Sequence, residues 1–469
     1  MKKQSPPTPA DAPRASASGR FMPLLLGILA FLTAGLSVAH AYPNEVYKTG
    51  SLYHWKINNV VIGNTADLAT AISNCIWNST GAPREIHVLT GGDLSATLGL
   101  PPDVKLYCHG NTYTRSHAGI GIYCKGVANI GIYDMTISTG THSGVQLTAC
   151  NNAVVSGLTV LSGYIGLRVD SHPSRPYEFW SYGLTVQNCR FENLGSHGLE
   201  TYGIDGVTIG NIIARNNGEC GVLLNKTHNA TVASVDAYRC SNGGGYAGLR
   251  FANDCLNITA NYLSAVECGR GFFTVSTVKN CTLQNAYIRG STSHAILLQN
   301  SDNVVVAGGT FTGDGLNHYT SVNCQINAVP IGPRRIVNAA SGRALDVAGG
   351  GNADGSPLQL WDYVGGTNQK WEVVDAGGGR YNLRSLQTGG RAVDSSLNPV
   401  NGTGTYIWSY LNNGAQKWQI QSVGNGRFRL NSHLNLSQCL DSNGTANGSP
   451  VIMWSYWGGA NQQWLIQNP

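Results

Sequence analysis

The feature that most constrains the fold of this chain is a small residue that recurs at nearly constant spacing. The recurring residues are Gly144, Gly166, Gly198, Gly221, Gly248, Gly271 and Ala295, which lie 22, 32, 23, 27, 23 and 24 residues apart. Self-similarity at such a period is typical of a solenoid, in which each coil buries its apolar face only against its neighbours. The two longer intervals predict insertions into the repeating coil.

A strand follows each small residue. The positions one and three after it are mostly apolar: Val145/Leu147, Leu167/Val169, Leu199/Thr201, Val222/Leu224, Leu249/Phe251, Phe272/Thr274 and Ile296/Leu298. This period-two alternation predicts strands with that face inward. A unit of about 23 residues is too short for the helical hairpin repeats and lacks a leucine-rich consensus, which leaves a right-handed parallel β-helix. Asn and Asp in the turns, which tolerate left-handed backbone, are Asn151, Asp205, Asn229, Asn257 and Asn303.

The N-terminus has the pattern of a targeting segment. Basic residues precede the apolar run MPLLLGILAFLTAGLSV, which ends in the small-x-small sequence Ala39-His40-Ala41. We therefore expect residues 1–41 to be a signal peptide and the protein to be secreted, to the extracellular space or the periplasm. An uncleaved membrane anchor is the alternative, because the run approaches the length of a membrane span.

The composition and net charge limit the kinds of molecule that this protein is expected to bind. The 60 glycines and 4 methionines favour many short strands, and a net charge of +5 spread along the chain argues against nucleic acid. We expect a monomer that does not contact a membrane once the signal is cleaved. Export permits disulfides among the 12 cysteines, but only Cys439 follows residue 330. The sequence leaves disulfides and buried free thiols equally open.

The first part of the chain also resembles a known superfamily. The segments REIHVLTGGDLSATLGLPPDVKLYCHGNTY and HAGIGIYCKGVANIGIYDMTI extend the repeat toward the N-terminus, after the predicted capping helix DLATAISNCIWN. Together they look like the N-terminal end of pectate-lyase-like β-helix proteins. The resemblance implies the fold over about residues 45–325. It leaves the reaction open, since that superfamily hosts lyases, hydrolases, esterases, epimerases and phage tailspikes.

Three Gln-x-Trp repeats mark the remainder of the chain. Their tryptophans, Trp371, Trp418 and Trp464, are 47 and 46 residues apart. This pattern resembles the ricin-type β-trefoil lectin, which is equivalent to a family of carbohydrate-binding modules on bacterial polysaccharidases. We therefore predict an all-β protein, a right-handed parallel β-helix followed by a β-trefoil. The expected domains are a catalytic β-helix at 42–325, a linker at 326–332 and a carbohydrate-binding trefoil at 333–469.

The lectin resemblance implies sugar sites built from an Asp, an aromatic platform and an Asn. The first repeat matches with Asp346, Gln359, Trp361 and Asn368, and the third with Asp441, Trp454 and Asn461. The second repeat keeps Asp394 and Trp408 but has Ala415 where the Asn is expected and Tyr406 where Gln359 stands. We expect two working sugar sites and a weakened or inactive middle one.

In the β-helix, outward-facing polar residues gather on the middle coils. Parallel neighbours about 4.8 Å apart place Arg168 beside Glu200, Asp170 beside Tyr202, and Tyr202 beside Asn225. The insertion DSHPSRPYEFWS leaves the coil here and offers Arg175 and Trp180. We interpret this furrow as the active site; an ordinary solvated ladder of ion pairs is the alternative.

Two chemistries fit these residues. In hydrolysis, Asp170 and Glu200 would form an inverting pair, although Arg168 should lower the pKa of Glu200, the wrong direction for a general acid. In β-elimination from a uronic-acid chain, Arg168, Arg250 and Arg270 would hold the sugar carboxylate, and Tyr202, His197 or Lys226 would exchange protons. Ca²⁺ held by Asp170, Glu200 and Glu219 is a further alternative.

We predict a secreted polysaccharide lyase acting on an acidic, pectin-like polymer, with a glycoside hydrolase and a non-catalytic adhesin as alternatives. The candidate catalytic residues are Arg168, Asp170, Glu200, Tyr202, Arg250 and His197. The candidate substrate-binding residues are Asn225, Arg175, Trp180, Lys226 and Arg270.

Overall fold

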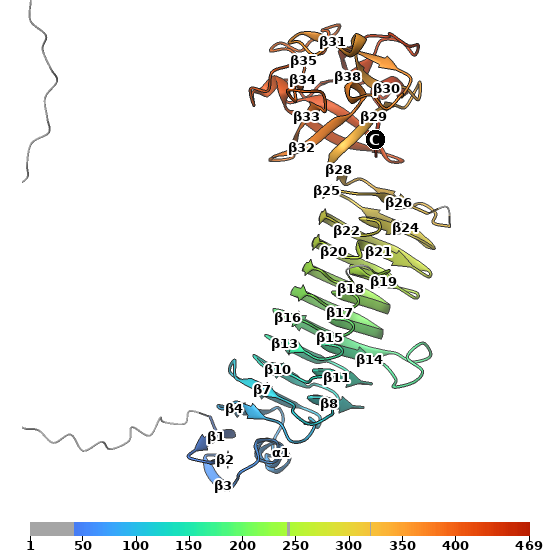
Figure 1. Cartoon of the computed structure of the whole chain (residues 1–469). Coiled ribbons are helices and arrows are strands. Elements are labelled where there is room, and N and C mark those ends of the chain that lie inside the picture. Colours follow the sequence, from blue (N-terminus) through green and yellow to red (C-terminus); the bar gives the residue numbers. More distant parts are fainter. Residues whose placement is uncertain (1–41, 242–243, 319) are drawn as a thin grey trace, which may run out of the picture. The chain divides into compact units, whose positions relative to one another are not determined.

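The computed structural model describes residues 42–469 apart from 242, 243 and 319, so the predicted signal peptide lies outside the described residues. Strands dominate and form one 28-stranded and one 12-stranded sheet. Figure 1 shows the first as a stack of coils and the second as a separate cluster of strands. This is the all-β architecture that the repeats predict.

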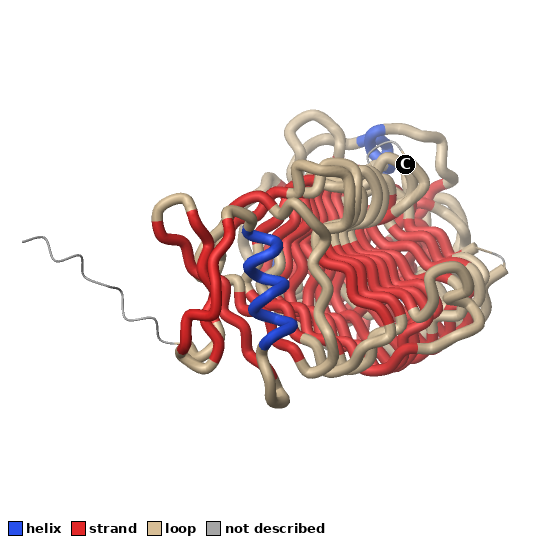
Figure 2. Tube along the Cα trace, turned by 90° about the horizontal axis from the view of Figure 1, so that it is seen from below, coloured by secondary structure: helices blue, strands red, loops and turns tan. Residues whose placement is uncertain are grey.

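A hairpin meander and one helix precede the stacked coils. Strands β1 (Glu45–Thr49), β2 (Leu52–Ile57) and β3 (Val60–Thr65) pair antiparallel. Helix α1 (Leu68–Asn78) follows, with Asp67 as N-cap accepting a 2.7 Å hydrogen bond from the Thr70 amide. Its apolar face is buried, and the helix lies beside the hairpins at the end of the coil (Figure 2). The predicted capping helix is confirmed.

From residue 84 on, parallel strands stack on three faces of the coil, and the long strands β17, β18, β20 and β22 bend across more than one face. The first face contains β8 (Ile122–Lys125), β11 (Val145–Thr148), β14 (Leu167–Asp170), β17 (Leu199–Arg215), β18 (Val222–Tyr238), β19 (Ala247–Ala252), β21 (Arg270–Val275), β23 (Ile296–Leu298) and β26 (Gly315–Asn317). The second adds β4 (Arg84–Val88), β6 (Val104–Tyr107), β9 (Gly131–Tyr133), β12 (Ala153–Ser156), β15 (Ser181–Gln187), β20 (Leu256–Val266), β22 (Val278–Arg289), β24 (Ser301–Val306) and β27 (Gln325–Ile326). The third adds β5 (Gly92–Asp93), β7 (Thr112–Thr114), β10 (Thr136–Ser138), β13 (Thr159–Ser162), β16 (Cys189–Glu192), β25 (Gly309–Phe311) and β28 (Val329–Pro330).

The recurring small residue is explained by close packing between coils. A Cβ on Gly198 would lie 2.5 Å from the carbonyl oxygen of Gly221, and one on Gly221 would lie 2.7 Å from that of Gly248. The apolar residues that follow are buried in one continuous core. Each coil therefore packs closely against the next only because this position has no bulky side chain.

Left-handed Asn residues form a ladder at one turn of the coil. Asn129, Asn152, Asn229, Asn257 and Asn303 have φ between 50° and 58°. Their side-chain amides form hydrogen bonds from one coil to the next. For example, the Asn257 amide donates to the Asn229 side-chain oxygen at 3.1 Å. The prediction was wrong at two turns, where Asn152 and Gly206, rather than Asn151 and Asp205, are left-handed.

The cysteines contribute to the core as free thiols. All 12 are unpaired, and all but the half-buried Cys324 are buried. Burial raises the pKa of the Cys220 and Cys255 thiols to about 12. Of the two alternatives that the sequence left open, the structure has the free thiols.

The second sheet has threefold internal repetition. Its strands are β29 (Gly332–Asn338), β30 (Ala344–Val347), β31 (Ser356–Trp361), β32 (Trp371–Gly377), β33 (Arg380–Ser385), β34 (Ala392–Asp394), β35 (Tyr406–Trp408), β36 (Trp418–Gly424), β37 (Arg427–Ser432), β38 (Gln438–Ser442), β39 (Val451–Ser455) and β40 (Trp464–Gln467). Trp371, Trp418 and Trp464 are fully buried, and their indoles donate to equivalent carbonyls at 3.0, 3.1 and 3.0 Å.

The interval 326–332, expected to be a linker, is mostly part of the two folded regions. Strand β28 pairs with β25 and so extends the coil to Pro330, and β29 begins at Gly332. The apolar side chain of Val329 is buried. The difference arises because the last coil is short and lacks the small-residue motif that defined the repeat.

Candidate functional site

Arg168 joins two buried carboxylates on the first face of the β-helix. Its Nε lies 3.0 Å from Asp170 Oδ2, and its Nη1 lies 3.7 Å from Glu200 Oε2. The register is the predicted one, with Arg168 opposite Glu200 and Asp170 opposite Tyr202. Because these two carboxylates neutralise its charge, the Arg168 guanidinium is poorly suited to bind an anionic ligand.

Asn225 and Tyr202 lie on the neighbouring positions of the same face. Asn225 is opposite Tyr202, and it donates a 3.4 Å hydrogen bond to Glu200 Oε1. The Asn225 side-chain oxygen accepts at 3.0 Å from Asn253. Asn225 therefore orients Glu200, while half-buried Tyr202 stands between Asp170 and Asn225 in the register.

The pKa of Glu200 departs from its ordinary value in the direction opposite to the one expected. Burial raises the pKa of this carboxyl, and the lowering effect of Arg168 and the raising effect of Asp170 are smaller. Arg168 does lower this pKa, as expected, but desolvation of a nearly buried group exceeds the attraction of a shared guanidinium, so the net change is upward. Glu200 is therefore suited to hold a proton.

Asp170 is sealed from solvent. Its side chain is 1% exposed, and Oδ2 is engaged by Arg168 and by Gln146 at 3.4 Å. Its Oδ1 has no hydrogen-bond partner among the described residues. The base of an inverting hydrolase must activate a water molecule on the opposite face of the sugar ring, and a buried carboxylate cannot reach such a water. The geometry therefore disfavours the Asp170–Glu200 pair as an inverting hydrolase couple.

A second cluster surrounds Glu219, whose direction the sequence does not reveal. Its Oε2 accepts from Ser196 Oγ and lies 3.0 Å from His197 Nε2, and its side chain is 30% exposed. Tyr246 also hydrogen-bonds to Glu219, whose charge is the largest cause raising the pKa of that phenol. Glu219 is thus a partly open carboxylate held by several donors on the same face as Glu200.

His197 is not the free base or acid that the sequence suggested. Its Nδ1 accepts a 3.0 Å hydrogen bond from the Cys220 amide, so Nε2 carries the proton given to Glu219. Burial, assisted by the charges of Arg250 and Arg168, lowers its pKa to about 4. With both ring nitrogens engaged, His197 is a neutral residue that positions Glu219.

Arg250 and Arg270 are two neighbouring cations without a carboxylate partner. Their guanidinium carbons lie 4.9 and 4.5 Å from the centre of the Phe273 ring, and Arg250 also lies 5.2 Å from that of Tyr246. The Nε atom of each is buried without a hydrogen-bond partner, and neither joins an ion pair among the described residues. Burial and the charge of Arg250 lower the pKa of Arg270. Two neighbouring guanidiniums in this arrangement can bind an anionic group.

The insertion after Asp170 is held in place by Lys226. The Lys226 ammonium donates to the carbonyls of Pro176 and Phe179 at 3.2 Å each and to that of Tyr177. It also lies 4.5 Å from the centre of the Trp180 ring. Lys226 is thus an anchor of the insertion, and the proton-transfer and substrate-binding roles considered for it do not agree with these contacts.

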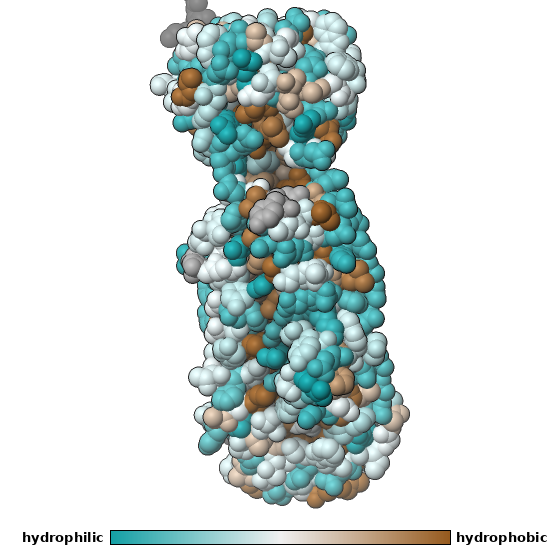
Figure 3. All heavy atoms as spheres, turned by 90° about the vertical axis from the view of Figure 1, so that its right-hand side faces the viewer, coloured by the Kyte–Doolittle hydropathy of each residue, from teal (hydrophilic) through white to brown (hydrophobic). Residues whose placement is uncertain are grey.

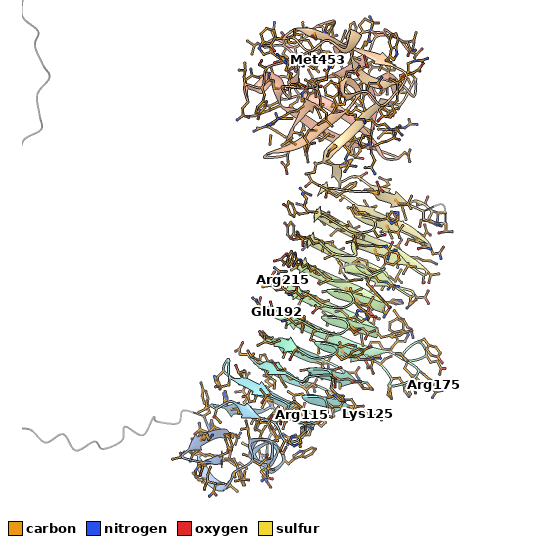
Figure 4. All side chains as sticks on the ribbon, in the orientation of Figure 1. Arg115, Lys125, Arg175, Glu192, Arg215 and Met453 are labelled. Atoms are coloured by element: carbon orange, nitrogen blue, oxygen red, sulfur yellow. The ribbon has the colours of Figure 1, made fainter. Side chains whose placement is uncertain are left out.

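Trp180 and Arg175 point away from the carboxylates. Trp180 packs against His228 and lines a separate cavity of about 260 Å³ with Lys226 and Asp254. Arg175 lies on the loop that projects from the coil (Figure 4), where it pairs with Glu178 at 3.0 Å. These predicted substrate-binding residues do not join the Arg168–Glu200 furrow, because the anchored insertion folds toward the following turn.

The residues on this face do not form a calcium site. No group of three or more His, Cys, Asp or Glu side chains suited to a metal occurs in the described part of the chain. The position between Asp170 and Glu200 that a cation would take is filled by the Arg168 guanidinium. The Ca²⁺ alternative does not fit this donor set.

Tyr246, Ser196 and Phe273 belong to the site but were not predicted. The signal for Tyr246 was the 27-residue interval between Gly221 and Gly248, which is longer than the usual spacing. The extra residues precede β19 and bring Tyr246 over Arg250. The shorter insertion therefore contributes to the site, whereas Arg175 and Trp180 of the longer one do not.

The surface around the site is polar. Figure 3 views the side on which β14 and β19 lie in Figure 1, and residues of hydrophilic or intermediate hydropathy cover most of the β-helix there, with apolar ones scattered among them. Within the described residues, no helix has the length and apolar character needed to cross a bilayer.

In the trefoil, the first repeat forms a complete pocket. Asp346 accepts from Gln359 at 2.9 Å and from Asn368 at 2.7 Å, and Trp361 is 40% exposed. These four residues line a cavity of about 320 Å³. An exposed indole beside an amide-braced carboxylate is the arrangement that stacks on a sugar ring and binds its hydroxyls.

The other two repeats are reduced versions of this pocket. In the third, Asp441 accepts from Asn461 at 3.0 Å beside exposed Trp454, but Ile452 occupies the position of Gln359. In the second, Asp394 accepts from the Ser396 amide, and the position of the absent Asn is filled by buried Ala415.

Two protein families match this chain. The model described as "Right handed beta helix region" matches residues 58–232 and 180–311, which together cover more than half of the chain. The model described as "Ricin-type beta-trefoil lectin domain" matches residues 332–464.

Solved structures that resemble the chain include the designed threefold symmetric protein ThreeFoil, at 33% identity over 29% of this chain and 99% of that one, with a TM-score of 0.28. A ricin B-like lectin of Macrolepiota procera in complex with lactose is 27% identical over 29% of this chain and 95% of its own, with a TM-score of 0.26. An exo-β-1,3-galactanase from Clostridium thermocellum is 26% identical over 29% of this chain and 30% of its own, with a TM-score of 0.27. The family matches, rather than these partial likenesses, carry the assignment.

Proposed function

We propose that this chain, which belongs to the right-handed β-helix family and carries a ricin-type β-trefoil lectin domain, is an exported lyase that cleaves an acidic polysaccharide. The two domains indicate a carbohydrate-active or carbohydrate-binding protein. The specific reaction proposed is β-elimination on a polymer that contains uronic acid.

The observation that carries the proposal is the unpaired Arg250–Arg270 couple. Two guanidiniums that share one aromatic ring and lack a protein counterion are suited to a carboxylate of the substrate, which guanidinium binds in two-point fashion. Neutralising a uronate carboxylate makes the adjacent C–H bond more acidic, which is the main requirement of elimination.

Two carboxyl groups can then transfer the protons. Glu219 is partly exposed beside Tyr246, over which Arg250 lies, and we assign it the role of base. It takes the proton from the carbon next to the carboxylate, the C–H electrons form a C=C bond, and the glycosidic C–O bond breaks. Glu200, whose pKa is raised by burial, supplies the proton to the departing oxygen.

The trefoil would tether the enzyme to its polymer. Binding of sugar at Trp361 and Trp454 raises the effective concentration of cleavable chain near the β-helix. This role predicts that the trefoil affects action on insoluble material more than action on short soluble chains.

The test is a product assay with purified protein on polygalacturonate, alginate and neutral plant polysaccharides. Elimination produces an unsaturated uronide that absorbs in the near ultraviolet. Arg250→Ala and Arg270→Ala should abolish this absorbance, whereas the matched control Arg239→Ala should not, since Arg239 is an exposed residue paired with Glu267. Absorbance that survives in both site variants would exclude the proposal.

Hydrolysis remains the second candidate because of the raised pKa of Glu200, which suits a general acid. Its partner would be Glu219 rather than sealed Asp170. The same assay separates the two reactions, since a hydrolase releases reducing ends without ultraviolet absorbance. Binding to polymer without any product would instead indicate the adhesin.

A further inference from the structure

A cavity on the surface of the described β-helix lies away from both carboxylate clusters. It has a volume of about 470 Å³ and lies on the second face, over β12, β15, β17 and β18. Its lining includes Asn152, Gly183, Gly206, Thr185, Thr208 and Thr231. None of the candidate catalytic residues contributes to it.

The cavity exists because the Asn ladder is interrupted over two successive coils. Where neighbouring coils have left-handed Asn152 and Asn229, these two have Gly183 and Gly206, with φ of 71° and 76°. A Cβ on Gly206 would meet nothing closer than the Gly183 nitrogen at 3.8 Å, so the missing side chains leave open space. The ladder resumes at Asn229, which donates to Asp205 at 2.7 Å.

The interruption also leaves an amide oxygen facing the gap. Asn152 donates to Asn129 at 3.1 Å, and its Oδ1 lies 2.7 Å from the position of a Cβ on Gly183. No described group donates to this oxygen. It is therefore an acceptor at the end of the cavity that is available to a ligand.

Threonines line the floor of the cavity in strict register. Thr185 pairs with Thr208, Thr208 with Thr231, and the column continues through Thr259 and Thr282. Parallel strands place these side chains about 4.8 Å apart along the coil axis. Within the described residues the hydroxyls of Thr185, Thr208 and Thr231 make no hydrogen bond to protein, and no charged side chain lines the cavity.

We propose that this groove binds a neutral glycan chain that runs along the coil axis. Evenly spaced hydroxyls, an open amide acceptor and exposed glycine backbone form hydrogen bonds with sugar hydroxyls, and the strand spacing is close to the length of one pyranose unit. The absence of charge in the lining selects an uncharged polymer. The groove is thus distinct from the acidic-substrate site and does not depend on the proposed reaction.

The experiment fills the groove with asparagine, the residue that occupies the equivalent position in neighbouring coils. Gly206→Asn suits the left-handed backbone at this position, since Asn adopts it in neighbouring coils. The background is the full chain with Trp361→Ala, Trp408→Ala and Trp454→Ala, so that trefoil binding does not obscure the result. Binding of hexasaccharides of β-1,4-linked glucose, xylose and mannose is measured by calorimetry.

We expect the background protein to bind at least one of these hexasaccharides and Gly206→Asn to lose that binding without a fall in melting temperature. A second variant, Thr208→Val with Thr231→Val, removes two hydroxyls with little change of shape and should weaken binding by about tenfold or more. Thr282→Val, in the same column but outside the cavity, is the matched control and should bind like the background.

Failure of the background protein to bind any of the three hexasaccharides overturns the proposal. Equal binding by the background, Gly206→Asn and the double threonine variant also overturns it, because the ligand then lies elsewhere. Neither result bears on elimination, which uses an acidic polymer and the Arg250–Arg270 couple.

Discussion

The trefoil and the β-helix assemble their candidate sites over different distances along the sequence. In the trefoil, Asp346 and Asn368 are 22 positions apart and belong to one repeat, so each sugar pocket is local. In the β-helix, Arg168, Glu219 and Arg250 come from different coils, and their partners are reached only across the stack. A local pocket can be lost without its neighbours, whereas a stacked site depends on every coil beneath it.

The largest expected effect is chemical and confined to the β-helix. Glu219→Gln should lower the rate of elimination by about 10³-fold, since it removes the proposed base while keeping the shape of the side chain. The rate is measured from the absorbance of the unsaturated product. Glu267→Gln, on the exposed pair with Arg239, is the matched control. Activity of Glu219→Gln within a few fold of the unchanged protein would remove Glu219 from the mechanism.

The next effect tests the stacking itself. Gly198→Ala should destabilise the β-helix by about 3 kcal/mol, because its Cβ would lie 2.5 Å from a backbone oxygen of the next coil. Gly210→Ala is the control, since its nearest contact would be an ordinary 3.4 Å. Denaturant unfolding measures both. Similar midpoints for the two variants would contradict the close-packing explanation of the repeat.

A smaller effect concerns the trefoil, whose repeats should differ in how much each contributes to sugar binding. Trp361→Ala should weaken binding to immobilised polysaccharide by about tenfold, because it removes the aromatic platform of the complete pocket. Trp408→Ala should change affinity less than about twofold, since its repeat lacks the Asn. Neither variant should alter turnover of short soluble chains. An equal loss in both would show that the middle repeat is a working site.

The smallest effect is a pH dependence of stability arising from Glu200. Burial raises its folded pKa above the unfolded value, so the folded state binds more protons and loses stability as pH rises through the interval between the two values. In Glu200→Gln this contribution is absent, and the stability profile from mildly acidic to neutral pH should be flatter. Thermal melting across that range measures it. A steeper profile in the variant would contradict the assigned direction.

Much of the fold was accessible from the sequence because its constraints are periodic. The spacing of Gly198, Gly221 and Gly248 predicted the stacked coils, and the register that follows placed Arg168 beside Glu200 correctly. The spacing of the buried tryptophans likewise predicted the trefoil, whose first pocket contains the expected residues.

The features that the sequence does not reveal are side-chain contacts across coils. The sequence favoured Lys226 and His197 as proton-transfer groups, but loop carbonyls hold the first, and Cys220 and Glu219 hold the second. Burial outweighs the expected lowering of the Glu200 pKa by Arg168. Each of these outcomes depends on which groups surround a side chain, and that is not periodic.

The coil, its register and the threefold lectin repeat follow from residue spacing alone, because backbone geometry turns regular spacing directly into stacking. Which charges are neutralised and which lack a partner depends on contacts that form when the coils stack. Arg168 is enclosed by two carboxylates while Arg250 and Arg270 have none, and Gly183 and Gly206 open a groove where other coils have Asn. The burial of a charged side chain and the identity of its partners depend on residues from neighbouring coils, so both are fixed only when the chain is folded.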